Sequence, residues 1–159
     1  MQQDFYQMNK ELSRLEKQEL ELYHRLAVQA GLSDSAFSIL AYLYEQQDSA
    51  PHTQNSLAKY LWLPKQTVNS AVNRLAADGY VVLQQMAVAR NSKAVRLTPQ
   101  GEAFCRRWIQ PILEAVKRSL TRMSDAEIET YFALSKKQAL FLQQELCDLL
   151  NTPERPANE

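Results

Sequence analysis

The sequence is poor in the residues that build metal sites, disulfide frameworks and phosphate-binding loops. Its 159 residues include three glycines, two cysteines and two histidines. Cys105 and Cys147 fall in predicted helices and are not spaced like a disulfide framework or a zinc site. His24 and His52 lie far apart in the chain, and three glycines form no Gly-rich loop. We therefore expect no metal and no cofactor.

Long apolar runs are also missing. No segment approaches the roughly 18 consecutive apolar residues that indicate a membrane-spanning helix. The start, Met1 to Asp4, lacks the basic and apolar regions of a secretory signal. We expect a cytoplasmic protein without a membrane partner.

The sequence shows no pattern of catalytic residues. The two histidines belong to different segments, and nothing places a nucleophile beside a base. Carboxylate pairs such as Glu19 and Glu21, or Glu127 and Glu129, are two residues apart on predicted helices and point in different directions. We predict that the protein is not an enzyme.

The chain has no net charge, but its charges are unevenly distributed. Eighteen Lys and Arg residues balance eighteen Asp and Glu residues. Between His52 and Thr98, six Lys or Arg residues face one carboxylate, Asp78, which gives this segment a charge of about +5. A basic segment between acidic ones is typical of a nucleic-acid binder. The alternative is an ordinary solvated basic face.

The basic segment contains two predicted helices joined by a tight turn. The first spans Gln54 to Leu61, and the second starts at Pro64 and ends at Gly79. One face of the second helix is apolar. Its other face carries amides, hydroxyls and cations but no carboxylate: Lys65, Gln66, Thr67, Asn69, Ser70, Asn73 and Arg74. Such side chains read base edges and phosphates, although two helices joined by a turn can also be plain packing.

Two strand-like runs follow, from Tyr80 to Gln85 and from Ala94 to Thr98. The first is rich in β-branched and aromatic residues, and the second alternates polar with apolar residues. The loop between them carries Arg90, Asn91 and Ser92. Basic residues at a hairpin tip beside a polar helix fit a wing that touches the DNA backbone or the minor groove.

The region before the basic segment is predicted to be two helices. A heptad-like apolar stripe indicates a long amphipathic helix from about Asp4 to Gln29, which Gly31 closes. Ser33 is a good N-cap for a second helix that is apolar on nearly all sides and therefore central and buried. The long helix cannot bury its whole stripe on a small domain, so it needs a partner.

The region after the wing is also predicted to be helical. Thr98 and Pro99 supply an N-cap and a first-turn proline, and Pro111 should bend the helix that follows. A capping box at Ser124 to Glu127 starts a last helix with a second heptad-like stripe. Residues 152–159, with two prolines, should form a flexible tail.

The order and spacing of these motifs resemble the multiple-antibiotic-resistance-type (MarR) family of winged helix-turn-helix regulators over nearly the whole chain. The matching stretches are Leu57-Ala58, Thr67-Val68, Val72 to Leu75, Asp78 to Val81 and Ser92 to Gly101. Two positions depart from the family. Its wing usually carries Asp-x-Arg where this chain has Ala89, Arg90 and Asn91, and it often has Arg at the position of Ser70.

The resemblance implies a mainly α fold with a small β-hairpin wing. The expected parts are an N-terminal dimerisation helix (1–31), a winged helix-turn-helix DNA-binding region (32–98), C-terminal dimerisation helices (99–151) and the tail. Two unsatisfied apolar stripes are most simply closed by a two-fold homodimer. The alternative is an antiparallel bundle within one chain.

The expected function is a DNA-binding transcription regulator that acts as a ligand-responsive repressor on a pseudo-palindromic duplex. The candidates for base-edge contacts are Gln66, Thr67, Asn69, Ser70 and Asn73. The candidates for phosphate or minor-groove contacts are Gln54, Lys65, Arg74, Arg90 and Lys93, with Asn91 beside Arg90 in the wing loop.

Relatives bind small aromatic acids or phenols in a crevice between the DNA-binding region and the dimer helices. The resemblance brings aromatic residues together there: Tyr23, Phe37, Tyr42, Tyr44 and Trp108. His24 and Arg25 are the nearest groups that could fix an anion. The alternative is that most of these rings are simply core.

Two other functions stay open. Cations next to Cys105 can lower a thiol pKa, so one alternative is a redox-responsive regulator that senses oxidants through Cys105 or Cys147; the favoured interpretation of Cys105 is an inert helix residue. A winged helix can also bind proteins without using DNA. The basic segment and the carboxylate-free helix face argue against that second alternative.

Overall fold

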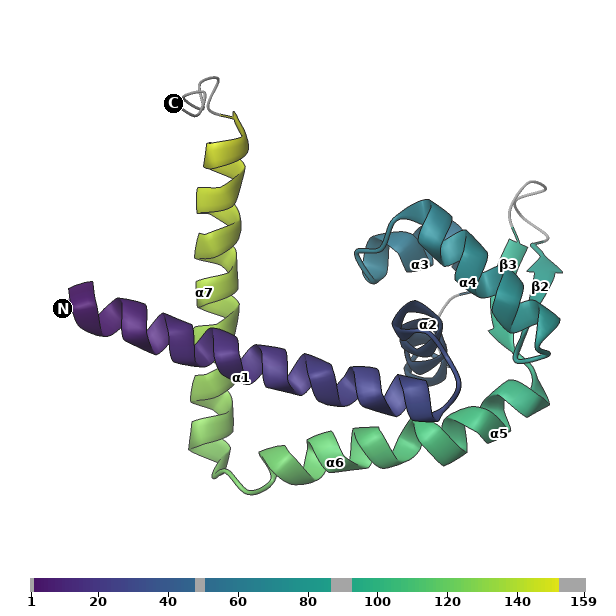
Figure 1. Ribbon diagram of the computed structural model, residues 1–159, viewed down its shortest axis with the longest axis horizontal. Helices are drawn as coiled ribbons and strands as arrows, with labels where there is room; N and C mark the ends of the chain where they lie inside the picture. Colours follow the sequence, from purple (N-terminus) through teal and green to yellow (C-terminus); the bar gives the residue numbers. More distant parts are fainter. Residues whose placement is uncertain (1, 48–50, 87–92, 152–159) are drawn as a thin grey trace. The chain divides into compact units, whose positions relative to one another are not determined.

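The computed structural model describes residues 2–47, 51–86 and 93–151 (Figure 1). The helices are α1 (Gln2–Gln29), α2 (Asp34–Glu45), α3 (Gln54–Tyr60), α4 (Lys65–Ala77), α5 (Pro99–Trp108), α6 (Gln110–Leu120) and α7 (Asp125–Asn151). The strands are β1 (His52–Thr53), β2 (Val81–Gln85) and β3 (Lys93–Leu97). The prediction of a mainly helical fold with a small wing is confirmed. The chain divides into two units, residues 1–112 and 113–159, which we describe separately.

Local sequence signals set most of the helix ends. Gly31 and Gly79 have φ values of +76° and +80°, and each closes a helix as predicted. At the end of α4 the Tyr80 N–H donates to the Leu75 carbonyl at 2.9 Å. Tyr80 therefore belongs to this helix-closing turn rather than to the strand, and β2 begins one residue later than predicted.

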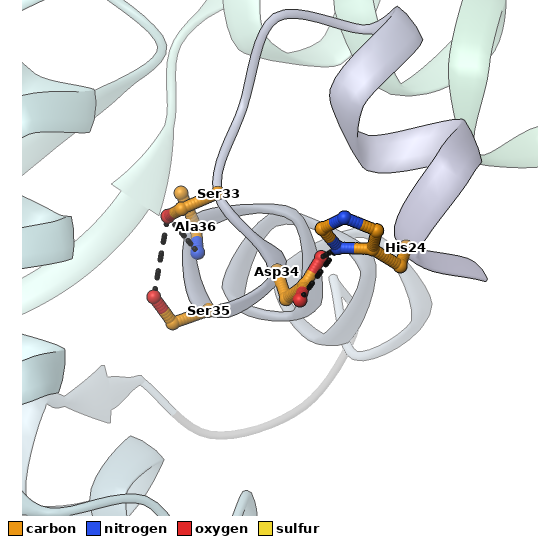
Figure 2. A network of polar contacts seen from close by, with 5 residues as sticks. All are labelled: His24, Ser33, Asp34, Ser35 and Ala36. Carbon is orange, nitrogen blue, oxygen red and sulfur yellow. Dashed lines mark hydrogen bonds and ion pairs between the residues drawn. The ribbon is translucent and has the colours of Figure 1, made fainter. Parts of the chain in front are cut away.

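The first residues of α2 and α3 are capped by hydroxyl groups. The Ser33 hydroxyl accepts from the backbone N–H of Ala36 at 3.3 Å (Figure 2), as its sequence position predicts. Thr53 and Ser56 form a reciprocal capping box at α3 that the sequence analysis missed. In this box Ser56 takes the place that Glu or Gln usually fills.

The sheet has the strand order β1-β3-β2, and all its pairs are antiparallel. Strand β1 was not predicted, because a two-residue strand is too short to show a periodicity. It pairs His52 with Val95 and Thr53 with Ala94. Ala94 and Val95 in the middle of β3 are buried, whereas Lys93 and Arg96 on either side of them are exposed.

Helix α2 lies at the centre of the first unit, as its all-round apolarity predicts. It packs against α1, α4, α5 and β3. Ile39 and Leu40 of α2 are completely inaccessible, and so are Leu75 of α4 and Cys105 of α5. The buried core therefore joins the central helix to the helix-turn-helix and to the start of the C-terminal region.

Helix α5 is attached closely to the end of α4. The Thr98 hydroxyl donates to the Gly79 carbonyl at 2.6 Å and accepts from the Gly101 N–H at 3.0 Å. A Cβ atom on Gly101 would lie 2.0 Å from the Tyr80 carbonyl oxygen, so only glycine fits there. This junction fixes the direction in which α5 leaves the wing. Thr98 is the N-cap of α5, as its place before Pro99 predicts, and β3 ends at Leu97, one residue before the end of the predicted strand.

The predicted bend at Pro111 is a break between two helices. α5 ends at Trp108, and α6 begins at Gln110 after Ile109. In the second unit, the capping box at the start of α7 is present as predicted. The Ser124 N–H and hydroxyl both donate to the Glu127 carboxylate, at 2.8 and 2.7 Å. These hydrogen bonds, from the hydroxyl first, lower the pKa of Glu127.

Helices α1 and α7 leave their apolar stripes exposed. Among the described side chains of α1, Ala27 alone is buried, and helix α7 has no buried side chain. The exposed apolar residues of α7 are Tyr131, Phe132, Leu134, Leu140, Phe141, Leu142, Leu146, Leu149 and Leu150. No single described helix is long and apolar enough to cross a membrane; only α1 and α2, taken together as a bent pair, reach that length and composition.

Candidate nucleic-acid interface

Helix α4 presents the polar face that the sequence predicted. Val68, Val72 and Leu75 are fully buried, and this orients the helix about its own axis. The opposite side chains then point to solvent. Lys65, Gln66, Asn69, Ser70, Asn73 and Arg74 are exposed, and Thr67 is half-buried. The face has hydroxyl, amide and cationic groups and no carboxylate until Asp78 caps the helix.

Two of the base-edge candidates contact each other. The side-chain NH₂ of Asn73 donates to the side-chain oxygen Oδ1 of Asn69 at 3.4 Å, one helical turn away. An asparagine that reads adenine uses both its oxygen and its NH₂ group. Either residue must therefore release this long hydrogen bond to read a base in that way.

Arg74 is less available than the sequence suggested. Its Nε donates to the Asp78 carboxylate at 2.9 Å, although the Arg74 side chain is 77% exposed. A guanidinium has five N–H donors, so the terminal nitrogens can still reach a phosphate. Asp78 nevertheless offsets part of the positive charge, which makes Lys65 the stronger candidate for a phosphate contact.

A surface groove runs between α4 and the start of α2. It is lined by Ser33, Ser35, Pro64, Gln66, Thr67, Ser70, Ala71 and Arg74. Ser33 and Ser35 were not among the sequence-predicted site residues, because only the tertiary packing of α2 on α4 brings them beside the polar face. Their hydroxyl groups lie 3.3 Å apart (Figure 2).

The one carboxylate in this part of α2 is directed toward α1. Nδ1 of His24 lies 2.9 and 3.0 Å from the two oxygens of Asp34 (Figure 2). Asp34 is thus paired with α1 and is not among the residues that line the groove. The same contact engages His24, which the resemblance had suggested as a group to fix an anionic ligand.

The remaining DNA-contact candidates lie in several places. Gln54 is the first residue of α3 and is half-buried, and Lys93 is exposed at the start of β3. Arg90 and Asn91 lie outside the described residues. The structure therefore places a predicted wing residue, Lys93, on the strand next to the wing loop and does not test the two contacts at its tip.

Two of the residues proposed for an effector site, Tyr42 and Trp108, have different ring neighbours. Tyr42 packs on Tyr60 and His52, with ring centroids 4.5 and 4.9 Å apart. Trp108 belongs to a different group, because its ring neighbours Phe104 at 6.4 Å. Among the other candidates, Phe37 is buried in the core, the Tyr44 hydroxyl donates to Gln110 at 3.2 Å, Tyr23 is half-buried, and Arg25 is exposed. Burial, with smaller contributions from Glu19 and Glu45, raises the pKa of Tyr23.

The structure argues against Cys105 as an oxidant sensor. Its side chain is fully buried, with Sγ 3.8 Å from the Leu40 carbonyl oxygen. Burial raises the pKa of the Cys105 thiol to about 12, and Glu102 outweighs the opposite effect of Arg106. The reactive thiolate is therefore scarce at neutral pH. Cys147 is exposed on α7.

Metal ligation has no basis in the described part of the chain. No group of three or more His, Cys, Asp or Glu side chains there could hold a metal ion. The chemistry of the described surface is therefore that of a polar, cationic helix beside a short hairpin. These elements define a winged helix-turn-helix protein.

Comparison with family models finds a similarity in the helix-turn-helix part of the chain. Residues 30–89 match the model of the MarR family. This segment, 60 of the 159 residues, contains α2, α3, α4 and β2, so the chain resembles the family over its helix-turn-helix part. No curated protein matches.

Solved structures share the fold. NMB1585, a MarR family regulator from Neisseria meningitidis, is 20% identical; the match covers 89% of this chain and 97% of that one, with a TM-score of 0.70. MepR of S. aureus in its DNA-binding conformation is 22% identical over 84% and 98% of the two chains, with a TM-score of 0.73. A MepR–DNA complex is 23% identical over 82% and 94%, with a TM-score of 0.70.

Proposed function

We propose that the protein is a homodimeric repressor that places α4 of each protomer in a major groove of duplex DNA. The exposed face of α4 carries this proposal, because it combines amides, hydroxyls and a lysine without a carboxylate. In helix-turn-helix proteins the second helix enters the groove and its N-terminal residues contact base edges. The solved MepR–DNA complex, which has a similar fold, supports duplex DNA as the partner.

The dimer is proposed from the exposed apolar stripes. Leu12 and Leu15 of α1 are half-exposed, and so are Leu142 and Leu146 of α7. Exposed apolar surface of this extent indicates an interface. A two-fold dimer binds two half-sites whose centres lie about 10 base pairs apart, so the operator is pseudo-palindromic. DNA as the partner also implies a cytoplasmic location.

The contacts are assigned by chemistry. We assign base-edge contacts to Gln66, Thr67, Asn69, Ser70 and Asn73. Phosphate contacts fall to Gln54, Lys65, Arg74 and Lys93, with Arg90 and Asn91 as the proposed contacts of the wing tip. Base-edge contacts specify the sequence, whereas phosphate contacts fix position and make binding depend on salt.

A titration of fluorescent duplex tests the proposal with two substitutions and a control. Lys65→Gln should weaken binding to every duplex and reduce the salt slope by about one. Asn69→Ala should change the preference among operator variants by about 1–3 kcal/mol per affected base pair. Lys10→Gln, on the exposed side of α1, removes the same charge away from α4 and should leave both properties unchanged. Equal binding by all three variants would contradict the contact model.

The response to an effector is part of the same proposal. The family resemblance supports a small aromatic or phenolic acid, and half-buried rings such as Tyr42 and Trp108 supply aromatic surface beside α2 and α5. At least one acid in a panel of phenolic acids should release the labelled operator from the protein. The same concentration should leave complexes of the protein with random-sequence duplex intact. If no acid in the panel raises the dissociation constant for the operator, this part of the proposal is wrong.

A further inference from the structure

Trp62 has an unusual backbone conformation for its residue type. It lies in the turn between α3 and α4 and has a φ of +53°. Among the described residues, Trp62 is the non-glycine residue with a positive φ. L-residues with a side chain are disfavoured in this left-handed region, whereas glycine enters it freely. The turn itself is held by hydrogen bonds, since the Leu63 N–H donates to the Ala58 carbonyl at 3.1 Å.

Packing does not explain why a tryptophan occupies this strained position. The Trp62 side chain is 89% exposed, so its ring gains little from burial within the chain. Glycine would relax the backbone there without loss of core. Backbone strain together with an exposed large aromatic ring is a combination that occurs at binding surfaces.

The surroundings of Trp62 are cationic and aromatic. Lys59, Tyr60 and Lys65 lie within three residues of it and are exposed. No Asp or Glu occurs from residue 51 to residue 77. Cations beside aromatic rings complement a polyanion whose sugars offer apolar surface.

The position of the turn defines what Trp62 would meet. In helix-turn-helix proteins the first helix crosses the DNA backbone, and the second enters the groove with its N-terminal end. Trp62 joins α3 to the N-terminal end of α4 and therefore lies where the chain passes from the backbone to the groove. The wing follows the other end of α4 (Figure 1), so the turn and the wing flank the recognition helix at its two ends.

We propose that Trp62 anchors the protein on the sugar-phosphate backbone that borders the half-site. The indole N–H donates to a phosphate oxygen, and the ring covers the adjacent deoxyribose. The contact is independent of base sequence and adds to the one that Lys65 makes. This inference depends on the proposed function, because it assigns a new residue to the same DNA surface.

Binding measurements on Trp62→Gly and Trp62→Phe test the contact. Trp62→Gly should weaken binding to operator and random duplex alike, by about tenfold. The salt slope should stay at the wild-type value because no charge is removed, in contrast to Lys65→Gln. Trp62→Phe keeps a ring but has no N–H, so its affinity should lie between those of the wild type and Trp62→Gly.

Thermal unfolding separates this effect from a folding defect. Glycine relieves the positive φ, so Trp62→Gly should unfold at the same temperature as the wild type or higher. Weaker DNA binding by a protein of equal or greater stability supports a direct contact. If its unfolding temperature falls, Trp62→Phe carries the test, since an aromatic replacement leaves the backbone preference nearly unchanged.

Tryptophan fluorescence provides a second measurement. The chain has two tryptophans, Trp62 and Trp108. Duplex should change the emission of the wild type, and Trp62→Phe should abolish that change while the Trp108 emission remains.

Three results decide between the proposals. If the wild type and Trp62→Gly bind duplex equally well, the anchor is overturned and the proposed function still holds. The emission of Trp62 could instead change with protein concentration and not respond to duplex. That result would assign the ring to a protein interface and would also overturn the anchor. Wild type that ignores every duplex at low salt contradicts the proposed function itself.

Discussion

Helices α2 and α7 both carry apolar side chains at helical spacing, but the surroundings of these side chains are opposite. Ile39 and Leu40 of α2 are completely inaccessible, whereas Leu146 and Leu149 of α7 are 49% and 61% exposed. α2 meets α1, α4, α5 and β3, so its apolar side chains are covered within one chain. Helix α7, which belongs to the second unit, has no buried side chain.

The difference separates folding from assembly. The apolar surface of α2 stabilises the helix-turn-helix directly, because burial removes it from water. The apolar surface of α7 can contribute only when a second surface covers it. The first unit should therefore fold without a partner, whereas the stability of α7 should depend on protein concentration.

Gly101→Ala should have the largest effect on the first unit. Its Cβ would lie 2.0 Å from the Tyr80 carbonyl oxygen, so α5 or the end of α4 must move. We expect a loss of about 3 kcal/mol or more in the free energy of unfolding, measured by urea denaturation. Gly31→Ala is the control: Gly31 has a positive φ, unlike Gly101, but a Cβ there meets nothing within 4 Å, and the substitution should cost about 1–2 kcal/mol. Equal losses would show that the junction is not tightly packed.

Leu142→Asp with Leu146→Asp should disrupt assembly while the first unit stays folded. Both side chains are half-exposed on α7, so charges there cost little in the monomer but are buried without partners in a dimer. Sedimentation should show a monomer, and operator affinity should fall by at least about a hundredfold, since two half-sites no longer act together. Lys136→Asp, at another exposed position of α7, is the control. An unchanged sedimentation coefficient would contradict the dimer through α7.

The two thiols should report on the two regions. Iodoacetamide at pH 8 should label Cys147 and leave Cys105 unmodified until the protein unfolds, because Cys105 is buried and its pKa is raised to about 12. The folded thiol stays protonated where the unfolded one ionises, so the free energy of unfolding should fall as pH rises from about 9 to about 12. Cys105→Ala should remove that part of the pH dependence. Rapid labelling of Cys105 in the native protein would show that the first unit opens readily.

Ser33→Ala should have the smallest of these effects. It removes the hydroxyl that caps α2 at the Ala36 N–H and should cost about 1 kcal/mol in urea denaturation. Ser38→Ala, at an exposed position inside the same helix, is the matched control and should change stability by less than about 0.5 kcal/mol. A loss as large at Ser38 as at Ser33 would mean that the cap contributes nothing specific.

Much of the fold was predictable because its signals are local. The caps at Ser33 and Ser124, the closing glycines and the break near Pro111 each depend on a few neighbouring residues. The exposed polar face of α4 was predictable for the same reason, since the buried stripe sets its orientation. Strand β1 was not, because two residues carry no periodicity.

The candidate site was predictable only in part. Ser33 and Ser35 join the groove because α2 packs on α4, and no sequence spacing encodes that approach. The Arg74–Asp78 and Asn69–Asn73 contacts follow from i, i+4 spacing and could have been anticipated. Tyr42 and Trp108, which the resemblance grouped, have different ring neighbours, and the sequence could not show those contacts.

The sequence by itself determined the helices, their caps, the apolar stripes and the carboxylate-free face of α4, because each depends on periodicity or on the preferences of single residues. Only the tertiary structure decided that the apolar side chains of α2 are covered by α1, α4, α5 and β3. It also decided that Cys105 is buried, that Asp34 pairs with His24, and that Trp62 adopts a left-handed backbone conformation. Burial and backbone strain depend on how distant segments pack, and that information is not local.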